Sequence, residues 1–327
     1  MSTNVVMTVL GPVAPEALGV TDAHSHLYIA PVPGGAADAP VLTDAEGVAR
    51  ELAVFREMGG GAIVDCQPGG CGRDGRVLHD LSARTGIHVV AATGFHRRLY
   101  YPPDAPLFSL STEAATDYFL SEIREGLEET RGADSSAQPF RGGQGSAIVY
   151  PGVIKIAAEA TLDACPLALF EAAAEVCRAT GYAIEMHTER GAAVESLLAF
   201  FGGRGVSPRR LVFCHVDKRP DFGLHRELAQ AGVLLEYDTF YRPKYEPERG
   251  VWPLLERLTA AGLGGSVALA TDMADPALWA ELGGGPGLAG IFTLIKPRLE
   301  RMGLPDETIG GLLGGNIAMR LATLSEL

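Results

Sequence analysis

GVTDAHSH, residues 19–26, is a short apolar run that ends in two histidines one residue apart. Side chains two positions apart in a β-strand point to the same face, so His24 and His26 would point to one place if the strand reaches them. A pair of imidazoles aimed together in this way is suited to holding a metal ion. A polar strand end with two solvated histidines is the alternative, and the rest of the chain must decide between them.

Seven further apolar or β-branched runs follow, separated by loops and helical patterns. Strands that alternate with helices indicate parallel pairing through right-handed crossovers. Eight such units predict an α/β fold, a (β/α)8 TIM barrel, because strands buried on both faces explain the continuous apolar runs. The predicted strands are residues 19–24, 61–66, 87–94, 152–157, 182–187, 211–215, 232–238 and 266–272.

The helical patterns between these strands carry recognisable end signals. Residues 162–181 are the clearest, with apolar residues at helical spacing, Asp163 as the predicted N-cap and Gly181 as the predicted stop. Residues 43–61 and 111–130 each begin with Ser or Thr before an acidic first turn. A doubly wound open sheet is the structural alternative, but no G-x-G-x-x-G follows the first strand.

The chain length of 327 residues is compatible with one barrel or with two smaller domains. No long linker divides the sequence, so we expect a single domain over residues 1–327 with an active site on its C-terminal face. Residues 1–18 are expected to be a short N-terminal extension. Residues 131–147, which are polar and rich in glycine, are expected to form a surface insertion.

Composition excludes several classes of partner. The formal net charge of −13 argues against nucleic acid or an anionic membrane surface, since both require clustered Lys and Arg. No apolar stretch approaches the ~20 residues that span a bilayer, and the first residues lack the pattern of a signal peptide, so we expect a cytoplasmic protein. Five cysteines without a C-x-x-C pair indicate neither a disulfide framework nor a thiolate zinc site.

Potential metal ligands recur at the ends of the predicted strands. In a barrel these C-terminal ends converge on one mouth, where enzymes of this fold carry their active sites. Each residue alone has an ordinary structural explanation, but six such residues at the same end of five strands favour a shared site. Imidazole and carboxylate suit Zn²⁺, Mn²⁺, Co²⁺ or Fe²⁺, with zinc expected first. The six residues are His24, His26, Lys155, His187, His215 and Asp272.

The motifs HSH, GVIKIA, MHT, CHVD and ATD, in this order, resemble the phosphotriesterase-related branch of the amidohydrolase superfamily. The resemblance implies that His24, His26 and Asp272 hold a first metal ion. It implies that His187 and His215 hold a second, and that Lys155 is carboxylated and bridges both ions. Ser25 departs from the family pattern, which more often has Glu between the first two histidines, but its side chain points away from the ions in a strand.

Two neighbouring cations lower the pKa of a bridging water enough to supply hydroxide near neutral pH. Asp272 is then the expected acceptor of its proton, and Lys155 and Asp272 are the predicted catalytic residues. We expect a binuclear hydrolase that cleaves a lactone or carboxylic ester of a small polar, or anionic, molecule. Phosphoester, phosphotriester and N-acyl amide hydrolysis are the alternatives. A metal-free binding module is an alternative of another class, and a mononuclear deaminase would not need Lys155.

Basic and aromatic residues in the loops after strands three, six and seven are predicted to bind the substrate by forming a collar around the mouth. Pairing with acidic residues of the same loops is the alternative. The loops look like those of family members that open sugar lactones, although MADPALW (273–279) lacks the arginine and tyrosine of the phosphate-binding members. Their polarity argues against a triesterase, and a homodimer is compatible with related barrels. The predicted substrate-binding residues are Arg97, Lys218, Arg219, Tyr241, Arg242 and Lys244.

Overall fold

Parallel strands form a closed barrel in the computed structural model, which describes residues 4–131 and 147–324. Neighbouring strands pair in parallel register, from β3 to β5 and from β6 to β11. The predicted (β/α)8 barrel is therefore confirmed. Its strands are β3 (Val20–Ser25), β4 (Gly60–Asp65), β5 (His88–Val90), β6 (Ala92–Gly94), β7 (Val153–Ala157), β8 (Ile184–His187), β9 (Leu211–Cys214), β10 (Leu234–Tyr237) and β11 (Val267–Leu269).

The third predicted strand is divided in two. Its first half, β5, pairs with β4, and its second half, β6, pairs with β7. The last and first strands meet through Asp22, whose Oδ1 accepts a hydrogen bond from the backbone N–H of Thr271 (2.9 Å). The predicted strand 266–272 was too long, because β11 ends at Leu269 and the following residues turn over the mouth.

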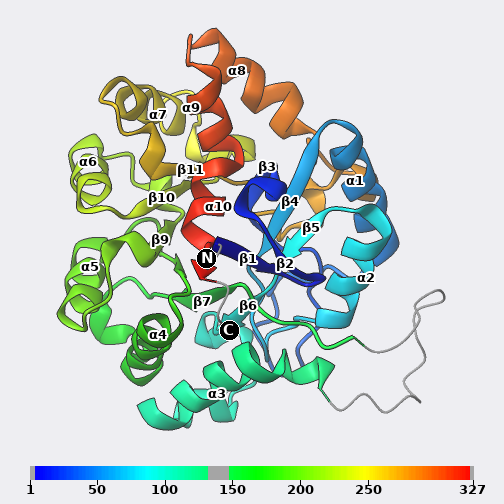
Figure 1. Ribbon diagram of the computed structural model, residues 1–327, viewed down its shortest axis with the longest axis vertical. Coiled ribbons are helices and arrows are strands. Elements are labelled where there is room, and N and C mark those ends of the chain that lie inside the picture. The colour runs from blue at the N-terminus through cyan, green and yellow to red at the C-terminus, as the bar shows by residue number, and fades with distance from the viewer. Residues whose placement is uncertain (1–3, 132–146, 325–327) are drawn as a thin grey trace.

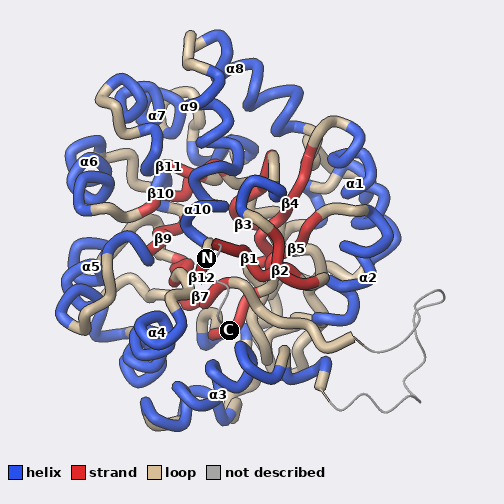
Figure 2. Tube along the Cα trace, viewed as in Figure 1, coloured by secondary structure: helices blue, strands red, loops and turns tan. Residues whose placement is uncertain are grey.

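A ring of helices surrounds the strands (Figures 1 and 2). The predicted helix 162–181 begins only at Leu167, since Pro166 removes a backbone donor and disfavours helical geometry at the residue before it. Asp163 therefore lies in a separate turn and not at the N-cap, which corrects the prediction, while Gly181 ends the helix as expected. The helices are α1 (Ala45–Glu57), α2 (Gly75–Thr85), α3 (Thr112–Glu125), α4 (Leu167–Thr180), α5 (Val194–Gly203), α6 (Phe222–Ala231), α7 (Val251–Ala260), α8 (Lys296–Arg301), α9 (Asp306–Gly310) and α10 (Asn316–Leu321).

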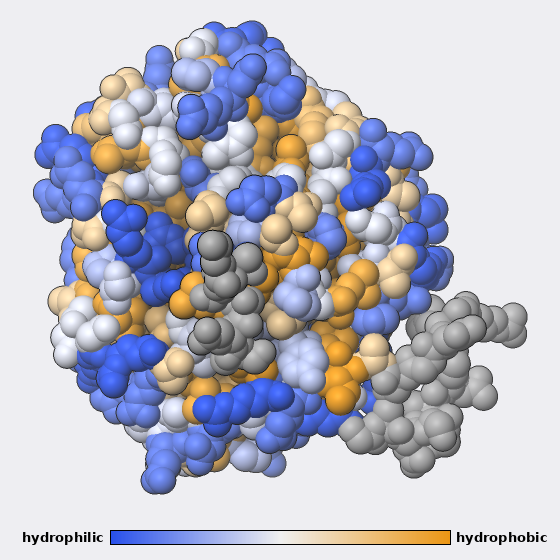
Figure 3. All heavy atoms as spheres, viewed as in Figure 1, coloured by the Kyte–Doolittle hydropathy of each residue, from blue (hydrophilic) through white to orange (hydrophobic). Residues whose placement is uncertain are grey.

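The face of the barrel opposite the mouth is covered by both ends of the described chain. β1 (Asn4–Thr8) pairs antiparallel with β2 (Gly11–Val13) and with β12 (Thr323–Leu324), and this small sheet lies beside α10 in Figure 1. The predicted N-terminal extension thus forms part of this cover. On the same face, hydrophilic side chains predominate over the outer helices (Figure 3). The predicted insertion at 131–147 lies almost wholly outside the described residues.

Alternation along the strands fills the barrel in layers. The lower inward positions are apolar: Val153, Ala183, Val212 and Leu234. Two residues further along each strand the buried positions are Lys155, Glu185, Cys214 and Glu236. The intervening residues, such as Ile154 and Ile184, pack outward in the larger core beneath the helices. Within the described ranges, no helix combines the length and apolarity needed to cross a membrane.

Buried His225 joins α6 to β10. Its Nδ1 lies 2.6 Å from the hydroxyl of Tyr237, and its Nε2 lies 3.0 Å from the carbonyl oxygen of Arg219. Burial lowers the pKa of His225 to about 4. An unfolded histidine has a pKa near 6.5, so between these values the unfolded chain binds a proton that the folded chain does not.

We expect the free energy of unfolding of the metal-free protein to fall with pH below about 6.5 because of this histidine. His225→Gln cannot take up the proton in either state. From pH 7 to pH 5 the parent should therefore lose about 2 kcal/mol more than the variant, at ~1.4 kcal/mol per pH unit. Urea unfolding at both pH values measures the difference, and equal losses for the two proteins would contradict the prediction.

Candidate active site

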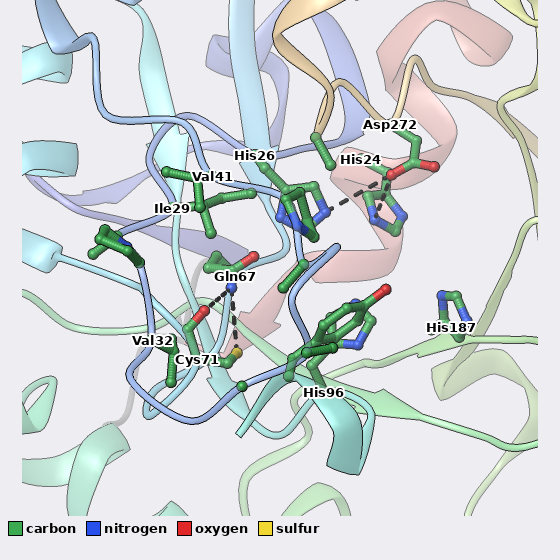
Figure 4. Close-up of a pocket in the computed structure, with 18 of the residues that line it drawn as sticks. His24, His26, Ile29, Val32, Val41, Gln67, Cys71, His96, His187 and Asp272 are labelled. Carbon is green, nitrogen blue, oxygen red and sulfur yellow. Dashed lines mark hydrogen bonds and ion pairs between the residues drawn. The ribbon is translucent and has the colours of Figure 1, made fainter. Parts of the chain in front are cut away.

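A cavity of about 380 Å³ opens at the carboxyl ends of the barrel strands (Figure 4). Five of the six predicted metal ligands line it, and the sixth, Lys155, lies fully buried in the layer beneath. The convergence expected from barrel geometry therefore occurs. The lining residues with polar side chains are His24, His26, Gln67, Cys71, His96, Tyr100, His187, His215, Lys218 and Asp272.

Two histidines at the end of the first strand lie close to Asp272, which follows the last strand. Nε2 of His24 and Nε2 of His26 each lie 3.8 Å from Oδ1 of Asp272. Two atoms bound to one zinc ion at ~2.1 Å lie within about 4.2 Å of each other. Each of these two histidine–aspartate pairs is therefore close enough to share one ion, and the three residues whose donor atoms all lie within 4.8 Å of one another are His24, His215 and Asp272.

Two of the site residues have strained backbones. Asp272 has φ +48° and His215 has φ +63°, in the left-handed region that residues other than glycine rarely adopt. The backbone N–H of Asp272 donates to the carbonyl of His24 (2.8 Å), which holds this turn against the first strand. Strain of this kind concentrates at functional sites, where the surrounding structure supports it.

Carboxylates behind the histidines orient two of the rings. Nδ1 of His24 lies 2.7 Å from Oε1 of Glu236, and Nδ1 of His215 contacts Oδ2 of Asp238. Both contacts engage Nδ1 and leave Nε2 for another ligand, as is typical of metal-binding histidines. Burial lowers the pKa of His24 and His215 well below its usual value, and that of His26 to about 4. The rings are therefore neutral near pH 7.

Lys155 stands among polar groups inside the barrel. Its Nζ lies 3.3 Å from both Nε2 of His24 and Oε1 of Glu185. Burial lowers the pKa of Lys155, whereas Cys214, Cys66 and Glu185 raise it, and the result lies above the usual value. The Lys155 amine thus lies between a histidine and a carboxyl group.

Gly94 allows the neighbouring strand to pass close to Lys155. A Cβ atom at Gly94, which has φ +113°, would approach the carbonyl oxygen of Lys155 to 1.9 Å. The next residue, Phe95, donates its backbone N–H to that oxygen (2.8 Å). A side chain at residue 94 would therefore push β6 away from β7.

His187 is the outermost of the predicted ligands. Its ring centroid lies 4.7 Å from that of His215, and its Nε2 lies 2.9 Å from Oε1 of Glu189. By contrast, donor atoms of His24, His215 and Asp272 all lie within 4.8 Å of one another. His187 thus reaches the cavity but stands apart from this tighter group.

Most of the predicted basic collar is engaged elsewhere. Arg97 pairs with Glu159 (3.0 Å) and Glu189 (2.9 Å), and Arg219 pairs with Glu195 (3.1 Å). Glu159 and Glu189 lie in the loops after β7 and β8, and Glu195 lies on α5, so none of them is in the arginines' own loops. Neither arginine lines the cavity as the described residues define it.

Tyr241 and Lys244 likewise do not line this cavity. The Tyr241 hydroxyl is buried. It lies against the backbone of Gly290, because a Cβ atom added there would come within 2.5 Å of it. Lys244 is exposed, with its Nζ 5.1 Å from the centroid of the Tyr245 ring. Both side chains therefore face other parts of the molecule.

Arg242 reaches the site but contacts Asp272. Its Nη2 lies 3.1 Å from Oδ2 of Asp272, and its Nη1 donates to the carbonyls of Thr271 (3.0 Å) and Asp238 (3.1 Å). Burial raises the pKa of Asp272, but Arg242 and His215 lower it, and the net pKa lies below its usual value. Arg242 thus keeps Asp272 ionised and joins the ends of β10 and β11.

Lys218 is the predicted substrate-binding residue that lines the cavity. Its Nζ lies 3.5 Å from Oδ1 of Asp238 and 4.0 Å from Oδ2 of Asp272. Its side chain is 11% exposed. One positive charge therefore faces the substrate space from this side.

The sequence did not reveal that the loop after β3 forms a wall of the cavity. Residues 27–43 fold back through an isolated bridge between Ile29 and Leu42. Their proline and glycine content indicated a loop, but not its path. The polar mouth inferred from the other loops was therefore incomplete, because this wall is apolar. Its lining residues include Ile29, Pro31, Val32, Pro40 and Val41.

Two proteins of known name are similar to this chain in sequence. A phosphofuranose lactonase of Mycoplasmopsis synoviae (strain 53) is 26% identical over 97% of this chain and 91% of its own. An N-acetyltaurine hydrolase of Rattus norvegicus is 28% identical over 72% of this chain and 71% of its own.

Among solved structures, an amidohydrolase from Mycoplasma synoviae has a TM-score of 0.87 at 26% identity, covering 99% of this chain and 93% of its own. A lactonase from Listeria monocytogenes has the same fold, with a TM-score of 0.85 at 22% identity and coverage of 98% and 100%. The model of the phosphotriesterase family matches residues 4–319. The chain therefore belongs to the phosphotriesterase family and is a metal-dependent hydrolase.

Proposed function

We propose that this protein hydrolyses lactones, or closely related carboxylic esters, at the cavity described above. The observation that carries the proposal is the convergence of His24, His26, His215 and Asp272 on an accessible cavity, where donor atoms of His24, His215 and Asp272 lie within 4.8 Å of one another. A relative named as a phospho-furanose lactonase, which matches 97% of this chain, supports the same reaction. The scissile carbonyl would lie at the inner end of the cavity.

His24, His26 and Asp272 would hold one divalent cation, and His187 and His215 a second, with carboxylated Lys155 between them. Two such cations, zinc first and manganese, cobalt or iron as alternatives, polarise the carbonyl and activate water near neutral pH. Oε2 of Glu185 and Oε2 of Glu236 are buried without a hydrogen-bond partner among the described residues. Buried carboxyl oxygens without a partner are costly, and burial raises the pKa of Glu236 well above its usual value. A cation bound above this layer would offset that cost, which supports cation binding here.

Asp272 would accept a proton from the attacking water and return it to the leaving alcohol. Arg242 favours this role, because it holds the carboxylate in place and stabilises its ionised form. Lys218 faces the same carboxylate and offers a charged donor to a substrate oxygen. The apolar wall after β3 would exclude water from the bound ring.

The cavity favours a substrate with at most one anionic group. Lys218 is its one cationic lining residue within the described ranges, and it is already near two carboxylates. Phosphate recognition usually uses several donors, above all arginines. N-acyl amide hydrolysis remains the second candidate, because relatives named N-acetyltaurine hydrolases match most of the chain.

A substrate panel tests the reaction. It should contain neutral and phosphorylated lactones, carboxylic esters, N-acyl amides and phosphotriesters, with acid release measured by a pH indicator. We expect turnover of neutral lactones, and about a 100- to 10,000-fold loss in Asp272→Asn with metal content retained, as for removal of a general base. Cleavage of amides or phosphotriesters alone would overturn the lactonase proposal. Parental turnover by Asp272→Asn would overturn the proton role.

The bridging role of Lys155 is tested by the metal content of the protein and its Lys155 variants. Carboxylation needs dissolved carbon dioxide, so bicarbonate should accelerate the reconstitution of the metal-free parent to two ions per chain. Lys155→Glu supplies a carboxylate directly and should not respond to bicarbonate, whereas Lys155→Met should retain at most one ion. Atomic emission measures the ions. Two tightly held ions in Lys155→Met would show that the lysine does not bridge them.

Arg242 is expected to position Asp272. Arg242→Gln removes the ion pair with that carboxylate, and we expect turnover to fall about 10- to 100-fold, as for other groups that orient metal-site residues. Arg219→Gln is the matched control, since its partner Glu195 is exposed and remote from the cavity. Steady-state kinetics on the best substrate measure both variants. Equal turnover of the two would mean that Arg242 has no such role.

A further inference from the structure

His96 faces the cavity, and the mechanism above gives it no role. It follows β6, only 7% of its surface is exposed, and it lines the cavity together with His187. The two ring centroids are 5.2 Å apart. Figure 4 shows His96 and Asp272 on different sides of the cavity. A substrate in this space would therefore lie between them.

The backbone fixes the position of the proton on His96. The N–H of Arg97 donates to Nδ1 of the ring (2.7 Å), so Nδ1 is an acceptor and the proton of the neutral ring is on Nε2. None of the residues that the structure describes accepts a hydrogen bond from this Nε2–H. A donor without a partner among the described residues is thus left on a ring that lines the cavity.

The same hydrogen bond argues against His96 as a metal ligand. A metal at Nε2 would need the lone pair on that nitrogen, which would put the proton on Nδ1. The N–H of Arg97 would then meet an N–H at 2.7 Å and lose its acceptor. The neighbouring His187 has no such restriction at its Nδ1, because its contact with Glu189 is through Nε2.

An aromatic contact holds the ring, and two hydrogen bonds hold the backbone beneath it, before any substrate binds. The ring of Tyr100 meets that of His96 edge to face, with centroids 4.8 Å apart. The backbone N–H of His96 donates to the hydroxyl of Tyr101 (3.0 Å), and this hydroxyl donates to the carbonyl of Gly69 (3.1 Å). A donor fixed in this way requires little reorganisation when charge develops on a nearby oxygen.

We propose that His96 is a catalytic residue whose Nε2–H donates to the acyl oxygen of the substrate and stabilises the negative charge that develops there. The assignment rests on the proposed acyl-transfer function. In this proposal His96 supplies a neutral hydrogen-bond donor to the substrate, and Lys218 supplies a charged donor from another wall of the cavity. One such donor typically contributes about 100- to 1,000-fold to turnover.

The test uses His96→Phe, which keeps an aromatic ring beside Tyr100 but has no donor. We expect kcat/KM on the best lactone to fall about 100- to 1,000-fold, mainly through kcat, with two metal ions per chain retained. His96→Gln has an amide donor and should recover part of the loss. His79→Phe, on α2 outside the cavity, is the matched control and should keep the parental kinetics.

A second readout does not depend on turnover. Nitrogen-15 NMR of histidine-labelled parent and His96→Phe should assign to His96 a ring protonated at Nε2 and not at Nδ1, with and without metal. The opposite tautomer, or loss of metal from His96→Phe, would overturn the proposal, since His96 would then be a ligand. Parental kcat/KM in His96→Phe would overturn it while leaving the lactonase function intact. A parent inactive on every acyl substrate would instead overturn the proposed function, and this assignment with it.

Discussion

Parallel pairing around a closed barrel is the constraint on which the whole site depends. Because side chains alternate along each strand, residues two apart fall in successive layers inside the barrel. Val153 and Lys155 on β7, and Ala183 just before β8 with Glu185 and His187 on it, follow this order from the apolar floor to the mouth. The residues at the mouth therefore stand on a base of packed strand side chains.

The layer beneath the mouth concentrates ionisable side chains in the buried interior of the barrel. Glu185, Glu236 and Lys155 are fully buried, and Glu236 also contacts His24. Such groups are costly to bury unless each finds a partner of opposite charge. The requirement for cations at the mouth and the presence of carboxylates below it are thus two parts of one electrostatic arrangement.

Two arginines that were predicted to bind the substrate form ion pairs between elements of the barrel. Arg242 ties Asp272 to the ends of two strands, and Arg97 bridges Glu159 and Glu189 around the rim. A planar guanidinium with five donors is well suited to such work. The substrate space that remains is bounded by Lys218, by His96 and by an apolar loop. This distribution favours an uncharged ring over a phosphorylated one.

Short apolar runs, their alternation with helical patterns and the polar residue at the end of each run determined the barrel and the candidate ligands from sequence alone. These features are local, and barrel topology converts them directly into a shared mouth. The partner of each arginine, the path of residues 27–43 and the cavity position of His96 were decided only by tertiary structure. They depend on contacts between residues far apart in the chain, such as Arg97 with Glu159 or Ala30 with Gly72, for which no local pattern exists.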